Sequence, residues 1–260
     1  MRTKFISLCI ALLVGVSAWA DDVWNYNVYD DCSKNGYKAD CVLAPSPAPA
    51  DVQAVDLGLP SGIKWASCNV GAEKPEDFGN YYAWGEVVPK NYYWWYTYKY
   101  ANGTSWDDPK LTKYCNEVRY GDNGFTDNKT TLDPEDDAAH VNWGGSWRMP
   151  TYAEWNELMD NCTWTWTKQN GINGINSIYG YRVASKTNSN SIFLPAAGSR
   201  GGPGLSIVGY DGGSYWSSLL NENSPRDAWY LVFGSGDVSM YGRDSDGYRV
   251  GGRSVRPVCP

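Results

Sequence analysis

The sequence predicts an α+β fold in which two helices accompany short, mostly antiparallel, twisted strands joined by long loops. The first indication is the stretch DAAHVNWGGSWRMPTYAEWNEL, residues 137–158, which contains the start of an amphipathic helix. The second is a set of short segments outside it that alternate or run apolar. The third is the content of 28 glycines in 260 residues, which favours many turns between short strands.

Residues 150–159 predict a helix with a defined start. Thr151 and Glu154 are spaced as a capping box, in which each side chain pairs with a backbone N–H that the first turn leaves open, and Pro150 lies just outside. Four apolar side chains then recur on one face, which must pack against something large. They are Tyr152, Trp155, Leu158 and Met159.

A second, shorter helix is expected just before it. Asp133 is placed to cap its first turn, and Pro134 suits its first helical position. The acidic residues 135–137 favour the positive end of the helix dipole, and residues 138–143 continue the helix.

Short strands account for most of the remaining regular structure. Alternation or apolar runs predict them over residues 63–67, 192–195, 228–233, 238–241 and 254–258. The glycines of residues 234–236 turn the chain from the third of these strands into the fourth.

The helical stretch resembles a known sequence signature. Formylglycine-generating-enzyme-like domains carry a pattern that reads roughly D-A-x-x-[YF]-x-x-W-x-(G)-x-R-L-P-T-E-A-E-W-E. The matching residues here are Asp137, Ala138, Trp143, Gly144, Arg148, Pro150, Thr151, Ala153, Glu154, Trp155 and Glu157, with Met149 in place of leucine. The resemblance implies a C-type-lectin-like fold.

Further segments resemble the Fibrobacter succinogenes major paralogous domain, over most of residues 52–260. They read VDLGLPSGIKWASCNVGA, NYYAWGE, NSIFLPAAGSR, YWSS and RSVRPV. That family is spread through secreted proteins of gut and fibre-degrading bacteria. The resemblance implies a lectin-like scaffold whose terminal strands pair, so residues 63–67 should lie near residues 254–258. It implies no reaction and leaves the ligand open.

The chain is expected to divide into three parts. Residues 1–20 combine basic residues, a short apolar run and Ala-Trp-Ala, which predicts a cleaved signal peptide, whereas a membrane anchor would need a longer run. Residues 21–51 are a small cysteine-bearing segment with a proline-rich linker. Residues 52–260 are the main domain, on which the polar, aromatic insert of residues 91–133 must lie. We expect a bacterial protein that is secreted, periplasmic or at the cell surface.

The net charge argues against a nucleic-acid partner. The chain carries 22 basic and 29 acidic residues, for a net charge of −7, and loss of Arg2 and Lys4 with the signal peptide leaves 20 against 29, or −9. Binding by counterion release needs a basic face, and the arginines here are scattered among glycines and aspartates. No membrane span is expected after signal cleavage.

Six cysteines remain after signal cleavage, and in an exported protein they are expected to form disulfides. They are Cys32, Cys41, Cys68, Cys115, Cys162 and Cys259. The pairing is open, although Cys32 with Cys41 is preferred because the residues between them can form a tight turn. Zinc is the alternative, but no cysteine pair has two-residue spacing and His140 is the only histidine.

Aromatic residues are the main candidates for ligand contact. The chain has 14 Trp and 20 Tyr but only 5 Phe, which favours rings that carry a hydrogen-bonding group. Seven tryptophans are expected in the core: Trp143, Trp147, Trp155, Trp164, Trp166, Trp216 and Trp229. The run over residues 92–100 is too densely aromatic to be wholly buried, so some rings should be exposed for binding, unless a strand laid over the core hides them. The candidates are Tyr92, Tyr93, Trp94, Trp95 and Tyr96.

Loops within residues 206–252 supply a second set of candidates, because their composition resembles that of adaptable binding loops. They are Tyr210, Asp211, Tyr215, Asn221, Asn223, Arg226, Asp227, Tyr241, Arg243, Asp244 and Tyr248. We expect a non-catalytic protein that binds a glycan or a surface protein through aromatic and polar loops. The alternative is a structural or assembly component of a bacterial surface or secreted complex. The oligomeric state stays open.

Few residues are candidates for metal binding or catalysis. Calcium could take oxygen ligands from Asp122, Asn123, Asp127 and Asn128, or from Asp244 and Asp246, but neither group completes a calcium loop. No other cofactor is expected. The copper-binding cysteine pair of formylglycine-generating enzymes has no counterpart within residues 163–258, and His140 has no nucleophile motif nearby. Paired carboxylates for glycoside hydrolysis stay open, because their separation is spatial.

Overall fold

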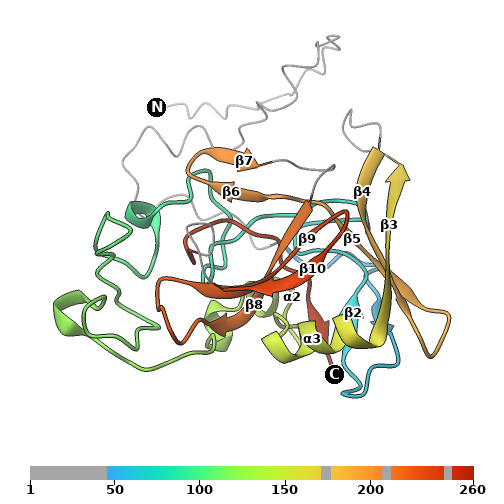
Figure 1. The fold of residues 1–260 in the computed structure, drawn as a ribbon, viewed down its shortest axis with the longest axis horizontal. Coiled ribbons are helices and arrows are strands. Elements are labelled where there is room, and N and C mark those ends of the chain that lie inside the picture. The colour runs from blue at the N-terminus through green and yellow to red at the C-terminus, as the bar shows by residue number, and fades with distance from the viewer. Residues whose placement is uncertain (1–45, 171–176, 207–211, 243–247) are drawn as a thin grey trace, which may run out of the picture.

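The computed structural model describes residues 46–170, 177–206, 212–242 and 248–260, whose regular structure is mainly antiparallel strand with two α-helices (Figure 1). The sheets have the strand orders β1-β2-β11, β10-β9-β8, β3-β4-β5 and β6-β7. The predicted α+β class is correct at this level. Across these ranges, no helix has the length and apolarity that a bilayer crossing requires.

The strands are β1 (Ala54–Asp56), β2 (Lys64–Ala66), β3 (Cys162–Asn170), β4 (Ser177–Ser185), β5 (Ser191–Pro195), β6 (Ser199–Gly201), β7 (Gly204–Ser206), β8 (Gly212–Leu220), β9 (Ala228–Gly234), β10 (Val238–Tyr241) and β11 (Val258–Cys259). The α-helices are α2 (Ala138–Trp143) and α3 (Tyr152–Asn161). Three short 3₁₀ turns are described: η1 (Trp95–Thr97), η2 (Asp122–Gly124) and η3 (Pro134–Asp136).

Helix α3 begins as the sequence predicts. The Glu154 N–H donates to Thr151 Oγ1 at 3.2 Å, and the Thr151 N–H donates to Glu154 Oε2 at 2.7 Å, which completes the capping box. Arg148 then pairs with both oxygens of Glu154, at 2.8 and 2.5 Å. Trp155 and Leu158 are buried, so the predicted face is the one that packs against strands β8 to β10.

The shorter helix differs from the prediction because it is interrupted. Residues 134–136 form the separate turn η3, and α2 begins afterwards with Asp137 as its N-cap. The extended backbone of Asp137 lets its carboxylate accept from the N–H groups of Ala139 and His140 at 2.9 and 3.0 Å, and from Met149 at 2.8 Å. Asp133 makes no side-chain cap.

Most of the predicted strands form, and the two ends of the main domain pair. β9 and β10 make the expected hairpin, and Val258 of β11 pairs with Trp65 of β2. The last strand is shorter than predicted, because residues 253–254 instead bridge to Tyr82 and Tyr215. Strands β3, β4 and β8 are not predicted. The sequence GGSYWSSLL of β8 has low strand propensity, so its neighbours on both faces must stabilise it.

Strand β8 separates the two main clusters of buried side chains. Successive residues of a strand point to opposite faces, and here Tyr215 packs in the cluster that contains Trp65 and Trp155. Trp216, its neighbour, packs in the cluster that contains Trp84. One strand, at the edge of its sheet, therefore contributes to two cores.

The aromatic insert is part of the second of these cores. Tyr93, Trp95, Tyr114 and other insert residues are buried in the same cluster as Trp216. The run of residues 92–100 does not form the strand considered as an alternative, since its regular structure is only the turn η1.

The predicted core tryptophans divide between the centre and the margin. Trp155 and Trp216 are fully buried, and their indole N–H groups donate to the backbone carbonyls of Trp216 and Tyr82 at 3.2 and 2.7 Å. The other five are half-buried at the edges of the clusters, so the core assignment is only partly correct for them: Trp143, Trp147, Trp164, Trp166 and Trp229.

The expected disulfides do not form among the cysteines that the structure describes. Cys68, Cys115, Cys162 and Cys259 are free and buried, and burial raises the pKa of each thiol. Cys115 and Cys162 pack in the two different clusters, and the thiols of Cys68 and Cys115 donate to the carbonyls of Ala72 and Glu117 at 3.5 and 3.2 Å. Cys32 and Cys41, like the predicted signal peptide, lie outside the described residues.

We predict that native protein protects these four thiols from alkylation. Burial excludes the reagent and keeps the thiols protonated, so iodoacetamide should label them slowly in buffer and completely in urea without reductant. Peptide mass spectrometry measures the labelling. A peptide pair joined through any of the four cysteines would contradict the prediction.

We also predict that Tyr98→Phe lowers the free energy of unfolding by about 1–3 kcal/mol, because the buried Trp84 carbonyl loses its donor. The Tyr98 hydroxyl donates to that carbonyl at 2.7 Å. Urea denaturation measures the change. The control is Tyr241→Phe on the exposed end of β10, which should change stability by less than about 0.5 kcal/mol. Equal effects would contradict the prediction.

Candidate functional site

The aromatic run splits into an inward set and an outward set. Tyr93 and Trp95 are buried, whereas the Trp94 and Tyr96 side chains are 39 % and 43 % exposed and Tyr92 is half-buried. We call Tyr92, Trp94 and Tyr96 the aromatic platform. The prediction that part of the run is exposed is confirmed. Tyr93 and Trp95 are wrong as ligand contacts, because both are core residues.

The backbone around η1 holds the platform in place. The hydroxyl of Thr97 lies 2.8 and 2.9 Å from the carbonyl oxygens of Tyr92 and Trp94, which closes the turn. The rings of Tyr92 and Tyr96 lie 5.2 Å apart. Beneath them, the backbone of Tyr93 exchanges two hydrogen bonds of 2.9 Å with Gly202. Several hydrogen bonds therefore hold the backbone that carries the platform.

Two of the C-terminal candidates meet the insert beside the platform. The Tyr248 ring lies 6.0 Å from that of Trp95, and the Arg226 guanidinium lies 5.8 Å from the Tyr248 ring. Arg226 also donates to the Trp106 carbonyl at 2.9 Å and lies 4.6 Å from the Tyr120 ring. Sequence reasoning missed Trp106 and Tyr120, since each is a single ring in a polar segment.

Three other C-terminal candidates are structural and are wrong as contacts. The Tyr215 hydroxyl donates to the Pro195 carbonyl at 2.7 Å, and burial raises its pKa to about 12. The Asn221 side chain donates to the Gly242 carbonyl. Asp227 is buried, which raises the pKa of its carboxyl.

The remaining C-terminal candidates are not gathered at the platform by any described contact. Tyr241 is exposed on β10 and packs near Tyr230, with ring centroids 6.4 Å apart. Asn223 is exposed in the loop before β9. Outside the described residues lie Tyr210, Asp211, Arg243 and Asp244.

A carboxylate cluster of Asp133, Glu135 and Asp136 has the spacing of a cation site. The Lys113 ammonium lies 2.6, 3.6 and 2.5 Å from these three carboxylates. A side-chain cation thus already lies where a metal ion would bind. Burial alone would lower the pKa of Lys113, but hydrogen bonds to Asp133 and Asp136 outweigh it and raise the pKa.

Asp136 is the buried member of this cluster. Burial alone would raise its pKa, but hydrogen bonds from Lys113, Tyr100 and Tyr114 more than offset burial and bring the pKa to about 2. Lys99 adds a contact of 3.1 Å. The cluster ties the insert to the start of η3.

Two of the residues considered for calcium, Asp122 and Asp127, have other side-chain partners. Asp127 accepts from the N–H groups of Tyr114 and Cys115 at 2.8 and 2.9 Å, and Asp122 accepts from Asn102 at 2.7 Å. These bonds organise the turns of the insert. The second group, Asp244 and Asp246, is not among the described residues.

His140 lies on α2, and its Nδ1 lies 3.3 Å from the Trp147 carbonyl oxygen. This contact joins the helix to the turn that follows it and gives the ring a structural role.

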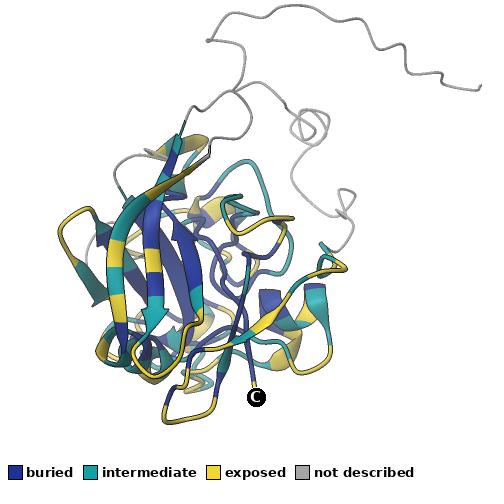
Figure 2. Ribbon diagram, turned by 90° about the vertical axis from the view of Figure 1, so that its right-hand side faces the viewer, coloured by how far each residue is buried: buried dark blue, intermediate teal, exposed yellow. Residues whose placement is uncertain are grey.

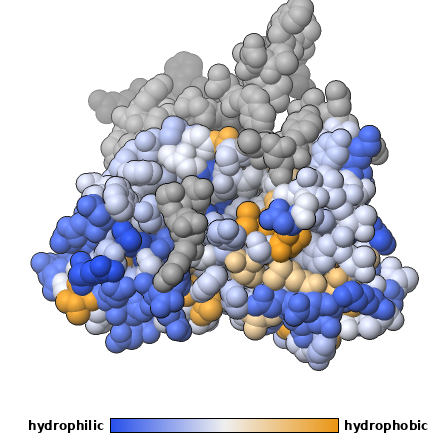
Figure 3. Space-filling model, in the orientation of Figure 1, coloured by the Kyte–Doolittle hydropathy of each residue, from blue (hydrophilic) through white to orange (hydrophobic). Residues whose placement is uncertain are grey.

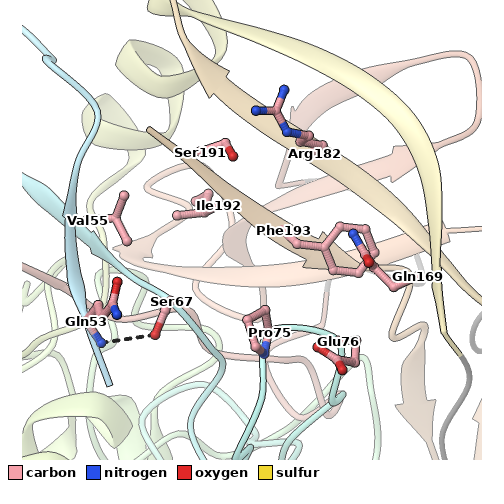
Figure 4. A pocket seen from close by; sticks show the side chains of 10 residues that line it. All are labelled: Gln53, Val55, Ser67, Pro75, Glu76, Gln169, Arg182, Ser191, Ile192 and Phe193. Carbon is pink, nitrogen blue, oxygen red and sulfur yellow. Dashed lines mark hydrogen bonds between the residues drawn. The ribbon is translucent and has the colours of Figure 1, made fainter. Parts of the chain in front are cut away.

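A cleft of about 330 Å³ opens between β1 and the sheet β3-β4-β5 (Figure 4). Its walls carry both polar and apolar groups. The lining residues are Gln53, Val55, Ser67, Pro75, Glu76, Gln169, Arg182, Ser191, Ile192 and Phe193. Sequence reasoning missed this cleft, because its residues come from six separate segments.

No family model, curated protein or solved structure matches the chain. The functional interpretation therefore comes from the residues and their geometry. By fold and site, the chain is a mainly β, α+β protein with an exposed aromatic platform and a mixed polar cleft.

We predict that Asp136→Asn lowers the free energy of unfolding at pH 7 by about 2 kcal/mol, which is the value of a pKa lowered from 3.8 to about 2. A lowered pKa stabilises the fold above the unfolded value and loses that contribution as pH falls. The deficit of the variant should therefore shrink between about pH 4 and pH 2. Urea denaturation across this range measures it.

The control is Glu135→Gln, since Glu135 belongs to the same turn but is 70 % exposed. It should change stability little at any pH. If Asp136→Asn lowers the free energy of unfolding equally at pH 2 and pH 7, the loss of stability would come from the changed shape of the side chain and not from its lost charge.

Proposed function

We propose that this protein is a non-catalytic binding protein that recognises a glycan through the aromatic platform. One observation carries the proposal: Trp94 and Tyr96 are exposed although their neighbours in the chain, Tyr93 and Trp95, are buried. Because burial alternates along this short segment, the rings of Trp94 and Tyr96 face outward while the buried side chains of Tyr93 and Trp95 hold the backbone in place. Exposing large aromatic rings costs free energy unless a ligand covers them, which makes such rings a mark of a binding surface.

The platform has the chemistry that a sugar ring needs. The C–H face of a pyranose can stack on an indole or phenol ring, while the phenol hydroxyl of Tyr92 offers hydrogen bonds to its hydroxyl groups. Tyr248, whose ring lies 6.0 Å from that of Trp95, and Arg226, whose guanidinium lies 5.8 Å from the Tyr248 ring, add polar groups. A surface protein remains the second ligand class of this proposal.

The finer description of the fold belongs to the same proposal. A C-type-lectin-like scaffold of the major paralogous domain family is supported by the pairing of β2 with β11 and by the capping box of α3. Export to the periplasm, cell surface or medium of a bacterium is supported by the sequence of residues 1–20.

A second candidate function uses the same rings for assembly. Trp and Tyr are among the residues that most often dominate protein–protein contacts, and Trp106 of the same insert is exposed as well as Trp94. In a structural component of a surface or secreted complex, these rings would be covered by another subunit.

We predict that Trp94→Ala and Tyr96→Ala each weaken binding to glycans found on an array by about tenfold, because each removes one stacking partner. Isothermal titration with the best array ligand measures the change. Thr97→Val, which removes the hydroxyl that closes the turn, should weaken binding less.

The matched control is Tyr241→Ala, an exposed ring on β10 with no described contact to the platform, which should bind as the wild type does. A blank glycan array together with a blank pull-down on microbial surfaces would contradict the proposal. Self-association that Trp94→Ala abolishes would favour the assembly function instead.

A further inference from the structure

Strand β3 leaves one of its two long edges open. It is the last strand of the sheet β3-β4-β5 and pairs with β4 in unbroken register over residues 162–170. Half of the backbone N–H and C=O groups of such a strand point away from its neighbour. No backbone group in the described part of the chain bonds to β3 on that side. In Figure 2 this sheet faces the viewer, and β3 carries most of its exposed residues.

The fold covers the other edge strand of the same length. β8 also has nine residues, and bridges from Gly198 and Ser254 occupy its second edge. By contrast, β3 has none of the features that usually protect a long edge. It contains no proline, its register with β4 has no shift, and Lys168 is its one charged residue. A long, regular edge of this kind is a template for another strand.

The side chains of β3 alternate between two kinds. The outer face of the sheet carries three threonines, which are Thr163, Thr165 and Thr167. Trp164 and Trp166 lie on the core face, with their rings 5.5 and 5.2 Å from that of Tyr181. Both tryptophans are only half-buried, since no strand of the sheet lies beyond β3.

We propose that β3 pairs with β3 of a second copy of this chain, antiparallel and centred on Thr165. In this register Trp164 lies opposite Trp166 of the second copy, and Thr163 lies opposite Thr167. No other centre pairs both tryptophans with a tryptophan. Aromatic and threonine pairs of this kind stabilise antiparallel strands. A two-fold axis relates the two copies, so their sheets become one continuous sheet.

Charge favours the same register. Lys168 is exposed and lies opposite Cys162 of the second copy, the residue that directly follows α3. The C-terminus of a helix carries partial negative charge, and the last turn of α3 contains Asp160 but no basic residue. Within one copy, Lys186 donates to the Asp160 carbonyl at 2.7 Å, which leaves the Asp160 carboxylate for Lys168 of the second copy.

The dimer is separate from the aromatic platform, because β3 shares no residue with it. An interface one strand wide is small, so we expect a dissociation constant on the order of 10 µM. Two linked platforms would bind a surface with repeated glycans more tightly than one. This last consequence rests on the proposed function, whereas the dimer itself does not.

The test is sedimentation equilibrium of the full chain from about 1 to 200 µM. Thr163→Glu with Thr167→Glu places like charges opposite each other and should weaken the dimer at least about tenfold. Thr163→Lys with Thr167→Glu places opposite charges there and should keep the dimer. Within one copy these positions pair with Ala184 and Gly180, so neither double variant places a charge directly opposite another inside the monomer.

A cysteine at the two-fold axis tests the register directly. Thr165→Cys places two thiols in one directly opposed pair, within reach of a disulfide, so mild oxidation should give a covalent dimer on a non-reducing gel. The matched control is Thr163→Cys, whose counterpart in the second copy lies about 13 Å away along the strand and should not join. The four described native thiols are buried and do not compete.

Three outcomes would overturn the proposal. One is a wild-type chain that stays monomeric over the whole concentration range. Another is a dimer that Thr163→Glu with Thr167→Glu leaves intact, which would indicate a different interface. The third is a dimer that Trp94→Ala abolishes, which would assign self-association to the aromatic platform.

Discussion

Buried backbone carbonyls are the constraint on which this structure depends. Long loops between short strands bring peptide groups into the interior, and each buried group needs a partner. Here aromatic and guanidinium side chains supply many of the donors. Tyr98 donates to Trp84, Trp216 donates to Tyr82, and Arg249 donates to Tyr114 at 2.7 Å. The preference for Trp and Tyr over Phe in this chain follows from the need for hydrogen-bond donors in the core as much as from any role in ligand binding.

The same bonds explain how a chain with little regular structure builds two cores. Strand β8 places Tyr215 in one cluster and Trp216 in the other, and both side chains donate to carbonyls of distant segments. Loops, strands and the insert are thereby joined around one strand (Figure 1). Buried Arg256 acts in the same way on the carbonyls of Ala66 and Phe193.

A rigid interior allows the surface to carry exposed binding groups. Tyr93 and Trp95 anchor the platform from inside, and Arg256 anchors the floor of the cleft. On the face in Figure 3, the most hydrophobic residues gather near β9 and β10, and most of the remaining surface is hydrophilic. The carboxylates of Asp133 and Asp136 are neutralised by Lys113, so this cluster stabilises the insert.

The sequence by itself determined the features that depend on neighbours in the chain. The capping box at Thr151 and Glu154 and the hairpin of β9 and β10 are local patterns, and both form as predicted. The density of rings in residues 92–100 also showed that some must be exposed.

Tertiary structure decided which rings those are, because burial depends on partners far along the chain. Gly202 and Tyr81 hold Tyr93 inward, and the burial of Tyr215 follows from Pro195 and Trp155. Neither the free thiols nor strand β8 could be predicted from the local sequence. The cleft could not be predicted for the same reason: Glu76 and Arg182 are separated by about a hundred residues, and only the tertiary packing brings the loop after β2 and strand β4 to one surface.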